Sequence, residues 1–179
     1  IGHSMGGLIS QLAATRGDAR ALVLLRSPVP SPLFPLRPKT MIGTLRAFSN
    51  PLLYRSTLRL LRWEADYLLF NRLDAADKPA CYQLLIAESG RAAYQVAFGP
   101  LNLAGSNRVD KAAVTCPVLS LAGADDRIVP AAAGRAMADW YGGAPRIDHR
   151  EYAEHAHMMM FEPGGDARVQ EIIGWLDAR

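Results

Sequence analysis

The chain opens with IGHSMGGLISQLAA (residues 1–14), and residues 2–6 of this stretch fit the pattern G-x-S-x-G. This pattern marks a sharp turn from a strand into a helix, which lifts a serine hydroxyl to the top of a parallel sheet. Only Ile1 remains of the strand that such a turn needs, and no initiator methionine precedes it. We therefore expect the C-terminal part of a longer chain, beginning at this turn.

The residues that follow the turn alternate between a helical and a strand-like pattern. Leu8, Leu12 and Ala13 share one helical face, and Gly17 follows as a helix stop signal. The run ALVLL (residues 21–25) is short and continuously apolar, which is typical of a strand buried on both faces of a parallel sheet. A strand, a helix and a second strand in this order predict an α/β fold.

The middle of the chain has a different composition. The stretch SPVPSPLFPLRPK (residues 27–39) carries five prolines, so it cannot continue as a helix or a central strand and is expected to be a linker. Three helical patterns follow, over residues 40–49, 52–70 and 75–89. Asp74 is the expected N-cap of the last one. We expect residues 28–108 to form a helical insertion whose ends, near Ser27 and Val109, are neighbours in space.

The alternation of strands and helices resumes after the insertion. The predicted elements are a buried strand at residues 117–121, a helix at 131–141, a strand nearer the sheet edge at 146–152 and a helix from about 166. In the last helix, the spacing of Val169, Ile172, Ile173 and Leu176 predicts the face that covers the sheet. The expected organisation is a partial core at residues 1–27, the insertion at 28–108 and a second part of the core at 109–179.

Composition and charge narrow the classes of function. The chain has 179 residues, of which 50% are hydrophobic and 21% charged, as in a globular enzyme. Its net charge is +3, but the Lys and Arg residues are scattered and not interleaved with aromatic residues. We therefore interpret the charge as a solvated surface and expect no nucleic-acid partner.

Cysteines and hydropathy are less informative. Cys81 and Cys116 lie far apart with no metal-type spacing, so we expect reduced thiols. No apolar run is long enough to cross a bilayer, so no membrane-spanning segment is expected. The sequence does not fix the location or the oligomeric state, although we favour the cytoplasm.

The residues with catalytic potential follow the predicted strands, where open parallel sheets place their sites. Serine is a poor nucleophile unless a base lies within hydrogen-bond reach and a third group orients that base. The candidates occur in the order Ser4, then Asp125 or Asp126, then His155 or His157. This order differs from those of chymotrypsin and subtilisin.

These motifs together resemble the α/β-hydrolase superfamily, from the turn at Ser4 to the C-terminus. GHSMGG (residues 2–7) resembles the nucleophile elbow of its esterases and lipases. GADDRIVP resembles its acid loop, in which the aspartate directly before RIVP is the triad acid, here Asp126. HAHMMMFEPG resembles its histidine loop, in which the catalytic histidine precedes a Glu-Pro, here His157. The resemblance implies a partial α/β-hydrolase fold that lacks its N-terminal strands, with residues 28–108 as a helical cap over the Ser4 side of the sheet.

The resemblance also implies a chemistry. Ser4 would attack a small ester-like acyl substrate, with His157 as the base and Asp126 as its orienting partner. The backbone N–H of Met5 would supply one oxyanion donor, and the second donor would precede Ile1. No metal or organic cofactor is implied. A non-catalytic, ligand-binding or receptor-like relative is the alternative, and the segment on its own is expected to be inactive.

Three further residues are assigned structural roles, and one run of residues is left open. His3 is interpreted as a packing or hydrogen-bonding residue, His149 as a strand residue and Glu162 as a packing or capping residue. The run of methionines at residues 158–160 either lines a pocket or packs in the core, because methionine adapts to irregular apolar shapes.

Overall fold

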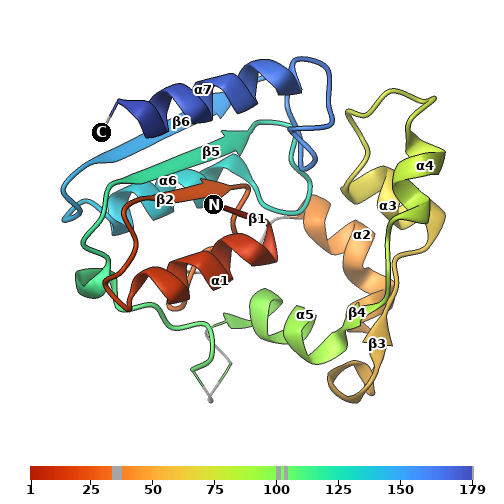
Figure 1. The fold of residues 1–179 in the computed structure, drawn as a ribbon. Helices are drawn as coiled ribbons and strands as arrows, with labels where there is room; N and C mark the ends of the chain where they lie inside the picture. Colours follow the sequence, from red (N-terminus) through yellow and green to blue (C-terminus); the bar gives the residue numbers. More distant parts are fainter. Residues whose placement is uncertain (34–37, 100–101, 103–104, 179) are drawn as a thin grey trace.

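The fold is centred on a four-stranded parallel sheet. The structure is a computed structural model that describes residues 1–33, 38–99, 102 and 105–178, so part of the predicted linker lies outside the described residues (Figure 1). The strands are β1 (Gly2–His3), β2 (Leu22–Leu25), β5 (Val118–Gly123) and β6 (Ile147–Tyr152), in the order β1-β2-β5-β6. Every neighbouring pair is parallel. The α/β class with a parallel sheet is therefore confirmed.

The apolar runs in the sequence become the central strands because helices cover both faces of the sheet. All four residues of β2 and all six of β5 are buried, whereas the β6 residues are mostly half-buried, as an edge strand requires. Helices α1 (Met5–Ala14) and α6 (Ala131–Trp140) cover one face. Helix α7 (Gly165–Asp177) covers the other (Figure 1). Alternate β2 residues therefore enter two separate cores, Leu22 and Leu24 on the first face, Val23 and Leu25 on the second.

The face of α7 that contacts the sheet agrees with the predicted one only in part, because Ile172 and Leu176 pack in the core beneath the helix. Val169 and Ile173 are exposed, while Ile172 and Trp175 are buried against β2 and β5. The Trp175 indole N–H also donates to the Asp148 carboxylate on β6, at 2.5 Å. Burial of the large tryptophan ring, with its polar end satisfied, turns the helix away from the face that aliphatic spacing alone suggests.

A group of short helices lies beyond the carboxyl ends of the sheet strands (Figure 1). Its elements are α2 (Pro38–Phe48), the 3-10 turn η1 (Leu53–Arg55), β3 (Thr57–Leu58), α3 (Arg62–Leu68), α4 (Lys78–Gln83), β4 (Glu88–Ser89) and α5 (Gly90–Ala97). The segment leaves and rejoins the core at adjacent points, because the Ser31 N–H donates to the Asn107 carbonyl at 3.1 Å and Ser31 forms a bridge with Arg108. The 3-10 turn η3 (Lys111–Ala113) then leads to β5.

Two of the helices predicted in this segment are wrong in extent. The expected helix at residues 52–70 is interrupted by β3, and the one at 75–89 is reduced to α4 and followed by β4. The antiparallel pairing of Thr57 with Ser89 and of Leu58 with Glu88 is a long-range contact, which a local pattern does not reveal.

The helix ends in this segment also differ from the prediction. Helix α4 begins after Asp77, not after Asp74, and has a proline in its first turn. Helix α5 was not predicted at all: the Ser89 hydroxyl caps it by accepting the Ala92 N–H at 3.2 Å. A Cβ added at Gly90 would lie 2.0 Å from the Leu53 carbonyl oxygen, so a glycine permits the close packing of α5 on η1.

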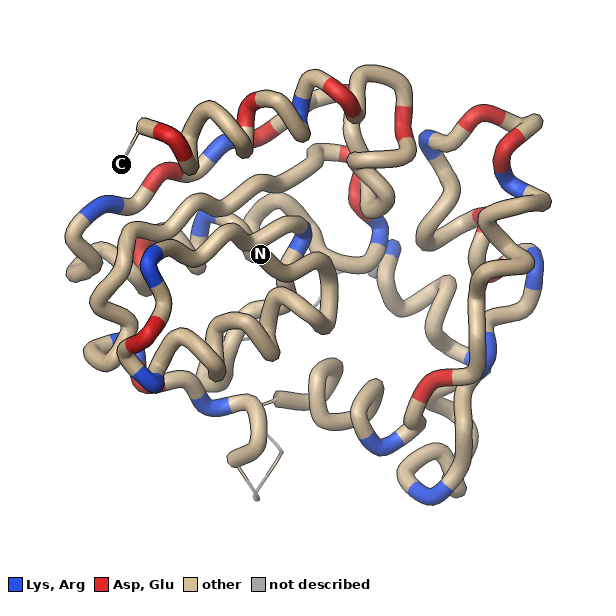
Figure 2. Tube along the Cα trace, in the orientation of Figure 1, with Lys and Arg blue, Asp and Glu red and all other residues tan. Residues whose placement is uncertain are grey.

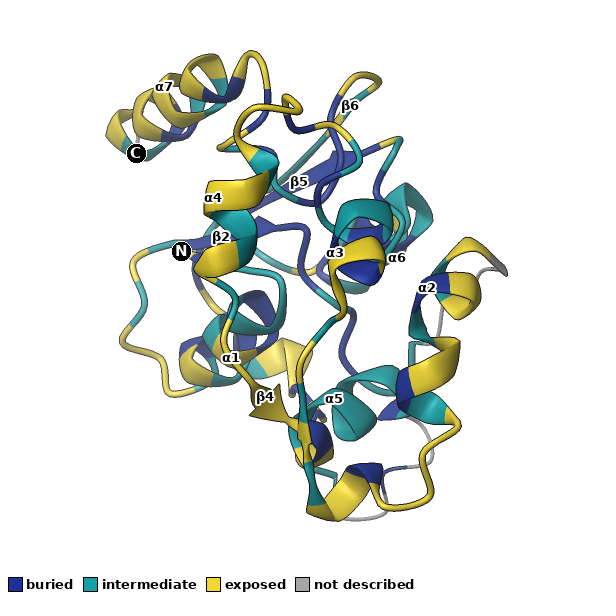
Figure 3. Ribbon diagram, turned by 90° about the vertical axis from the view of Figure 1, so that its right-hand side faces the viewer, coloured by how far each residue is buried: buried dark blue, intermediate teal, exposed yellow. Residues whose placement is uncertain are grey.

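Charged residues are distributed over the whole described chain. Figure 2 shows Lys and Arg positions separated by acidic or neutral ones along the trace, with neither sign gathered in one element. Buried residues concentrate in the sheet and the inner sides of its helices, whereas much of the helical segment is exposed (Figure 3). The stable core of the molecule is therefore the sheet and its covering helices.

Candidate active site

Ser4 lies in a strained turn between β1 and α1. Its backbone has φ 51° and ψ −130°, a conformation that residues other than glycine rarely adopt. The Ser4 N–H donates to the Leu25 carbonyl at 2.9 Å, which ties the turn to β2. A Cβ added at Gly2 would lie 2.3 Å from the Gly6 carbonyl oxygen, so the turn requires a glycine there. Although Ser4 is the N-cap residue of α1, its hydroxyl does not cap the helix.

The Ser4 hydroxyl instead begins a chain of hydrogen bonds that joins three loops. Ser4 Oγ lies 3.0 Å from His157 Nε2, and His157 Nδ1 lies 2.9 Å from Asp126 Oδ2. These distances fit the tautomer in which Nδ1–H donates to the carboxylate and Nε2 accepts from the serine hydroxyl. The three residues follow β1, β5 and β6, whose carboxyl ends share one edge of the sheet.

Both side-chain oxygens of Asp126 accept hydrogen bonds. Its second oxygen, Oδ1, accepts the backbone N–H groups of Ile128 at 2.8 Å and Val129 at 2.9 Å. Asp126 is 6% exposed and His157 only 1%. Hydrogen bonds from three donors offset the desolvation of the buried carboxylate, and they leave it fixed against the imidazole.

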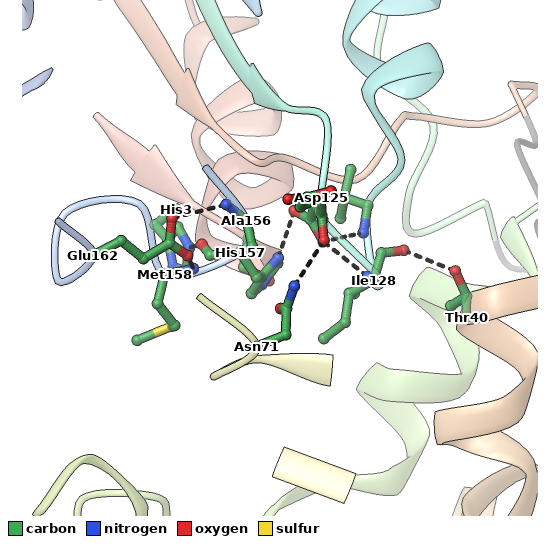
Figure 4. A network of polar contacts seen from close by, with 12 residues as sticks. His3, Thr40, Asn71, Asp125, Ile128, Ala156, His157, Met158 and Glu162 are labelled. Carbon is green, nitrogen blue, oxygen red and sulfur yellow. Dashed lines mark hydrogen bonds and ion pairs between the residues drawn. The ribbon is translucent and has the colours of Figure 1, made fainter. Parts of the chain in front are cut away.

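The rival acid and base lie elsewhere. The Asp125 carboxylate accepts from the Arg72 guanidinium at 2.6 Å, and the Asp125 carbonyl accepts from the Asn71 amide at 3.0 Å, so Asp125 faces the helical segment (Figure 4). His155 Nδ1 lies 3.1 Å from a Glu162 carboxylate oxygen. Neither Asp125 nor His155 is in the chain of hydrogen bonds that includes Ser4.

Glu162, which the sequence assigned to packing or capping, accepts backbone hydrogen bonds beside His157. One of its oxygens accepts the Ala156 N–H at 2.7 Å, and the other accepts the Met158 N–H at 3.1 Å. The Glu162 carboxylate is 4% exposed and therefore clamps the peptide groups on both sides of His157. The Glu-Pro at the end of the histidine loop was the only signal in the sequence, and it does not indicate which amides the carboxylate accepts.

His3 supports the same loop from the sheet. Its Nε2 lies 2.8 Å from the His157 carbonyl oxygen, which makes this nitrogen the donor. Burial, assisted by the neighbouring His157, lowers the pKa of His3 from 6.5 to about 4. His3 is therefore neutral at pH 7 and serves as a hydrogen-bonding residue.

The other predicted residues are placed around this centre. Met5 is the first residue of α1, and the first N–H groups of a helix have no acceptor within it. In the methionine run, Met159 is fully buried in the core beneath α7, and Met158 packs against Ala65, Phe70 and Leu73 of the helical segment. Among the described residues, no group of three or more His, Cys, Asp or Glu side chains is positioned to hold a metal ion. The described helices also include none that is both long and apolar enough to span a membrane.

Comparisons with solved structures match nearly the whole chain. A monoglyceride lipase variant from Saccharomyces cerevisiae is 18% identical with a TM-score of 0.69, and the match covers 99% of this chain and 60% of that one. A monoacylglycerol lipase from Paleococcus ferrophilus is 22% identical (TM-score 0.62; 98% and 66% covered). A thermophilic esterase from Thermogutta terrifontis is 19% identical (TM-score 0.61; 99% and 63% covered). The chain thus spans between 60% and 66% of the length of these three proteins.

The family comparison agrees with this likeness in fold. A family model described as serine aminopeptidase, S33, matches residues 1–164, which include the turn at Ser4, the acid loop and the histidine loop. The sheet order and the helices on its two faces are those of an α/β-hydrolase, covered in part. The chain therefore belongs to the S33 serine aminopeptidase family of the α/β-hydrolase superfamily.

Proposed function

We propose that this chain is the catalytic part of a serine hydrolase that cleaves a small ester-like acyl substrate through an acyl-enzyme on Ser4. The observation that carries the proposal is the hydrogen-bonded chain Ser4–His157–Asp126 at the carboxyl edge of the sheet. The ester-cleaving relatives among the similar structures support the choice of substrate class.

The chemistry follows from the positions of the protons. As Ser4 Oγ attacks the substrate carbonyl carbon, its proton passes to His157 Nε2, and the Asp126 carboxylate stabilises the resulting imidazolium. The imidazolium then donates this proton to the leaving alcohol as the carbon–oxygen bond breaks. In the second half, His157 takes a proton from water as the water oxygen attacks the acyl carbon. His157 then returns this proton to Ser4 Oγ as the bond between Ser4 and the acyl group breaks and the acid leaves. The enzyme is unchanged after both steps.

The negative charge on the substrate oxygen needs donors. The Met5 N–H, at the start of α1, is our candidate for one of them, because it adjoins the nucleophile and points out of a helix N-terminus, where partial positive charge gathers. Losing a single oxyanion donor typically lowers the rate by about 10²–10³-fold.

We assign the helical segment at residues 28–108 the role of a cap. Its Asn71 and Arg72 contact Asp125 in the acid loop, and its Thr40 hydroxyl donates to the Ile128 carbonyl at 3.4 Å. These contacts fasten the segment to the acid loop beside Asp126, where one face of it would roof an acyl group.

A fluorophosphonate probe on the full-length protein tests the proposal. This probe phosphonylates only a serine that is activated as a nucleophile. We expect covalent labelling at Ser4, none in Ser4→Ala, and cleavage of p-nitrophenyl butyrate in preference to an aminoacyl p-nitroanilide. A folded protein that binds apolar ligands but is not labelled would instead be the non-catalytic relative.

The acid is tested by a matched pair of variants. Asp126→Asn leaves the shape intact but favours the wrong histidine tautomer, which in a triad lowers kcat by about 10⁴-fold. The neighbouring Asp125→Asn is expected to retain most of the activity, because Asp125 pairs with Arg72. The reverse result would reassign the acid to Asp125.

A further inference from the structure

Arg26 is a buried cation that the proposed mechanism does not use. It directly follows β2, has φ 51°, and is only 2% exposed. Its backbone N–H donates to the Leu121 carbonyl at 3.1 Å, so its position at the carboxyl edge of the sheet is fixed. Among the described residues, none of its three guanidinium nitrogens has a hydrogen-bond partner. An arginine buried in this way is costly and calls for a reason.

The Arg26 side chain extends from the end of β2 to the end of the neighbouring strand β5. A Cβ added at Gly123 would lie 2.3 Å from both terminal guanidinium nitrogens and 2.3 Å from the His155 carbonyl oxygen. The guanidinium therefore lies against the end of β5, between the start of the acid loop and the histidine loop. Gly123 leaves the space that the guanidinium occupies.

The charged and titratable groups around Arg26 come from four parts of the fold. They are Asp126 after β5, Glu162 at the end of the histidine loop, Tyr152 on β6 and His3 on β1. Asp126 and Glu162 are both buried carboxylates. Burial lowers the pKa of Arg26 to about 10, against the opposing effect of these carboxylates, so Arg26 remains a cation at neutral pH. The cluster thus places the Arg26 guanidinium close to the side chains of Asp126 and Glu162.

We propose that Arg26 is a positioning residue whose buried positive charge balances the Asp126 and Glu162 carboxylates and so keeps His157 in its neutral, proton-accepting form. This inference rests on the proposed function, because it concerns the base of that reaction. Without the cation, two uncompensated carboxylates would favour the imidazolium form of His157, which cannot take the Ser4 proton. As the pH is lowered, labelling of Ser4 would then be lost earlier, that is, at a higher pH than in the unsubstituted protein.

The test measures the rate of fluorophosphonate labelling against pH in the full-length protein. For Arg26→Met, we expect the acidic midpoint of the rate to move upward by about one pH unit, the scale on which a nearby charge acts on a buried group. Arg26→Gln is a second neutral variant in case the methionine variant does not fold. Arg26→Lys keeps the charge and is expected to keep the midpoint of the unsubstituted protein. Arg16→Met, an exposed arginine beyond the end of α1, is the matched control.

The outcomes separate this inference from the proposed function. A purely structural role for Arg26 would lower the labelling rate or the melting temperature without moving the midpoint, and that result would overturn the inference. An equal shift in Arg26→Lys would also overturn it, because the charge would not be the cause. If the unsubstituted protein is labelled normally, either result leaves the proposed function standing. If the unsubstituted protein is not labelled, both the proposed function and the inference on Arg26 are wrong.

Discussion

His157 is held through its backbone as well as through its ring. Glu162 accepts the amides on either side of it, and His3 donates to its carbonyl. In the proposed mechanism His157 is the general base, which must stay within hydrogen-bond reach of the proton that it takes, so groups that fix its backbone are expected to affect the rate.

The Glu162→Gln variant tests this clamp. One carboxylate oxygen is replaced by an NH₂ group, which would face a backbone N–H and lose one hydrogen bond. We expect a roughly tenfold lower labelling rate, since a displacement of 1 Å at a reacting group costs up to about 10²-fold. The exposed Glu154→Gln is the control and should leave the rate unchanged. Equal rates in the two variants would show that the clamp does not position His157.

His3 predicts a pH dependence of stability. Its pKa is lowered to about 4 in the folded state from an ordinary value of 6.5, so the unfolded state binds the proton more tightly. The stabilisation is complete above about pH 6.5 and is lost as the pH falls toward 4. His3→Gln keeps an N–H donor but does not titrate. We expect the free energy of unfolding, measured by urea denaturation, to decline between pH 6.5 and pH 4 in both proteins. The decline should be smaller in His3→Gln than in the unsubstituted protein, by up to about 3 kcal/mol. Parallel declines would refute the assignment.

Helices α2 and α3 are joined by one buried carboxylate. Glu64, 1% exposed, accepts two hydrogen bonds at 2.7 Å from the Arg46 guanidinium and one at 2.7 Å from the Leu61 N–H. The hydrogen bond from Arg46 lowers the pKa of Glu64, so the pair is stabilising above the ordinary carboxylate range and weakens in acid. The helical segment has a small apolar core, and this pair adds a polar connection between α2 and α3.

Arg46→Met should therefore loosen the helical segment. The change leaves a buried carboxylate without its main donor, for which we expect a loss of about 2 kcal/mol. Hydrogen exchange of the α2 and α3 amides should report it as faster local opening. Arg62→Met breaks an exposed i,i+4 pair with Asp66. This variant should change the free energy of local opening, measured from the same amides, by no more than about 0.5 kcal/mol. Similar effects of both variants would show that the buried pair stabilises the helical segment no more than the exposed pair does.

At the scale of the whole molecule, the chain exposes surface that is normally covered in an α/β sheet. Among the described strands, β1 pairs only with β2, so its other edge is open. Ile1 is 69% exposed, and Ile9, on the covering helix α1, is 58% exposed. Open strand edges and exposed apolar side chains favour association between chains.

We expect the segment expressed alone to aggregate or to lack cooperative unfolding, and to show no esterase activity. Burial contributes about 25 cal/mol per Å², so a few hundred Å² of uncovered apolar surface amounts to a large part of a typical stability of 5–15 kcal/mol. Size-exclusion chromatography, thermal denaturation and p-nitrophenyl butyrate hydrolysis check this, with the full-length protein as the control. A soluble, cooperatively folding monomer that cleaves the ester would contradict it.

The sequence by itself determined the sheet and the positions of its loops. The β2 and β5 segments are recognisable because a strand covered on both faces must be apolar throughout. The G-x-S-x-G turn is recognisable because a side chain would clash with nearby backbone in the turn, as a Cβ at Gly2 would with Gly6. These signals are local, so each can be understood from a few consecutive residues.

Only the tertiary structure decided what depends on contacts between distant residues. The residues alone left Asp125 and Asp126 open, and the fold turns one toward Arg72 and the other toward His157. The same holds for the pairing of β3 with β4, for the hydrogen bonds that Glu162 accepts and for the burial of Arg26. Each depends on contacts between residues that are not adjacent in the sequence. Their energies arise from burial and from hydrogen bonds made after the chain has folded back on itself, so no short stretch of sequence records them.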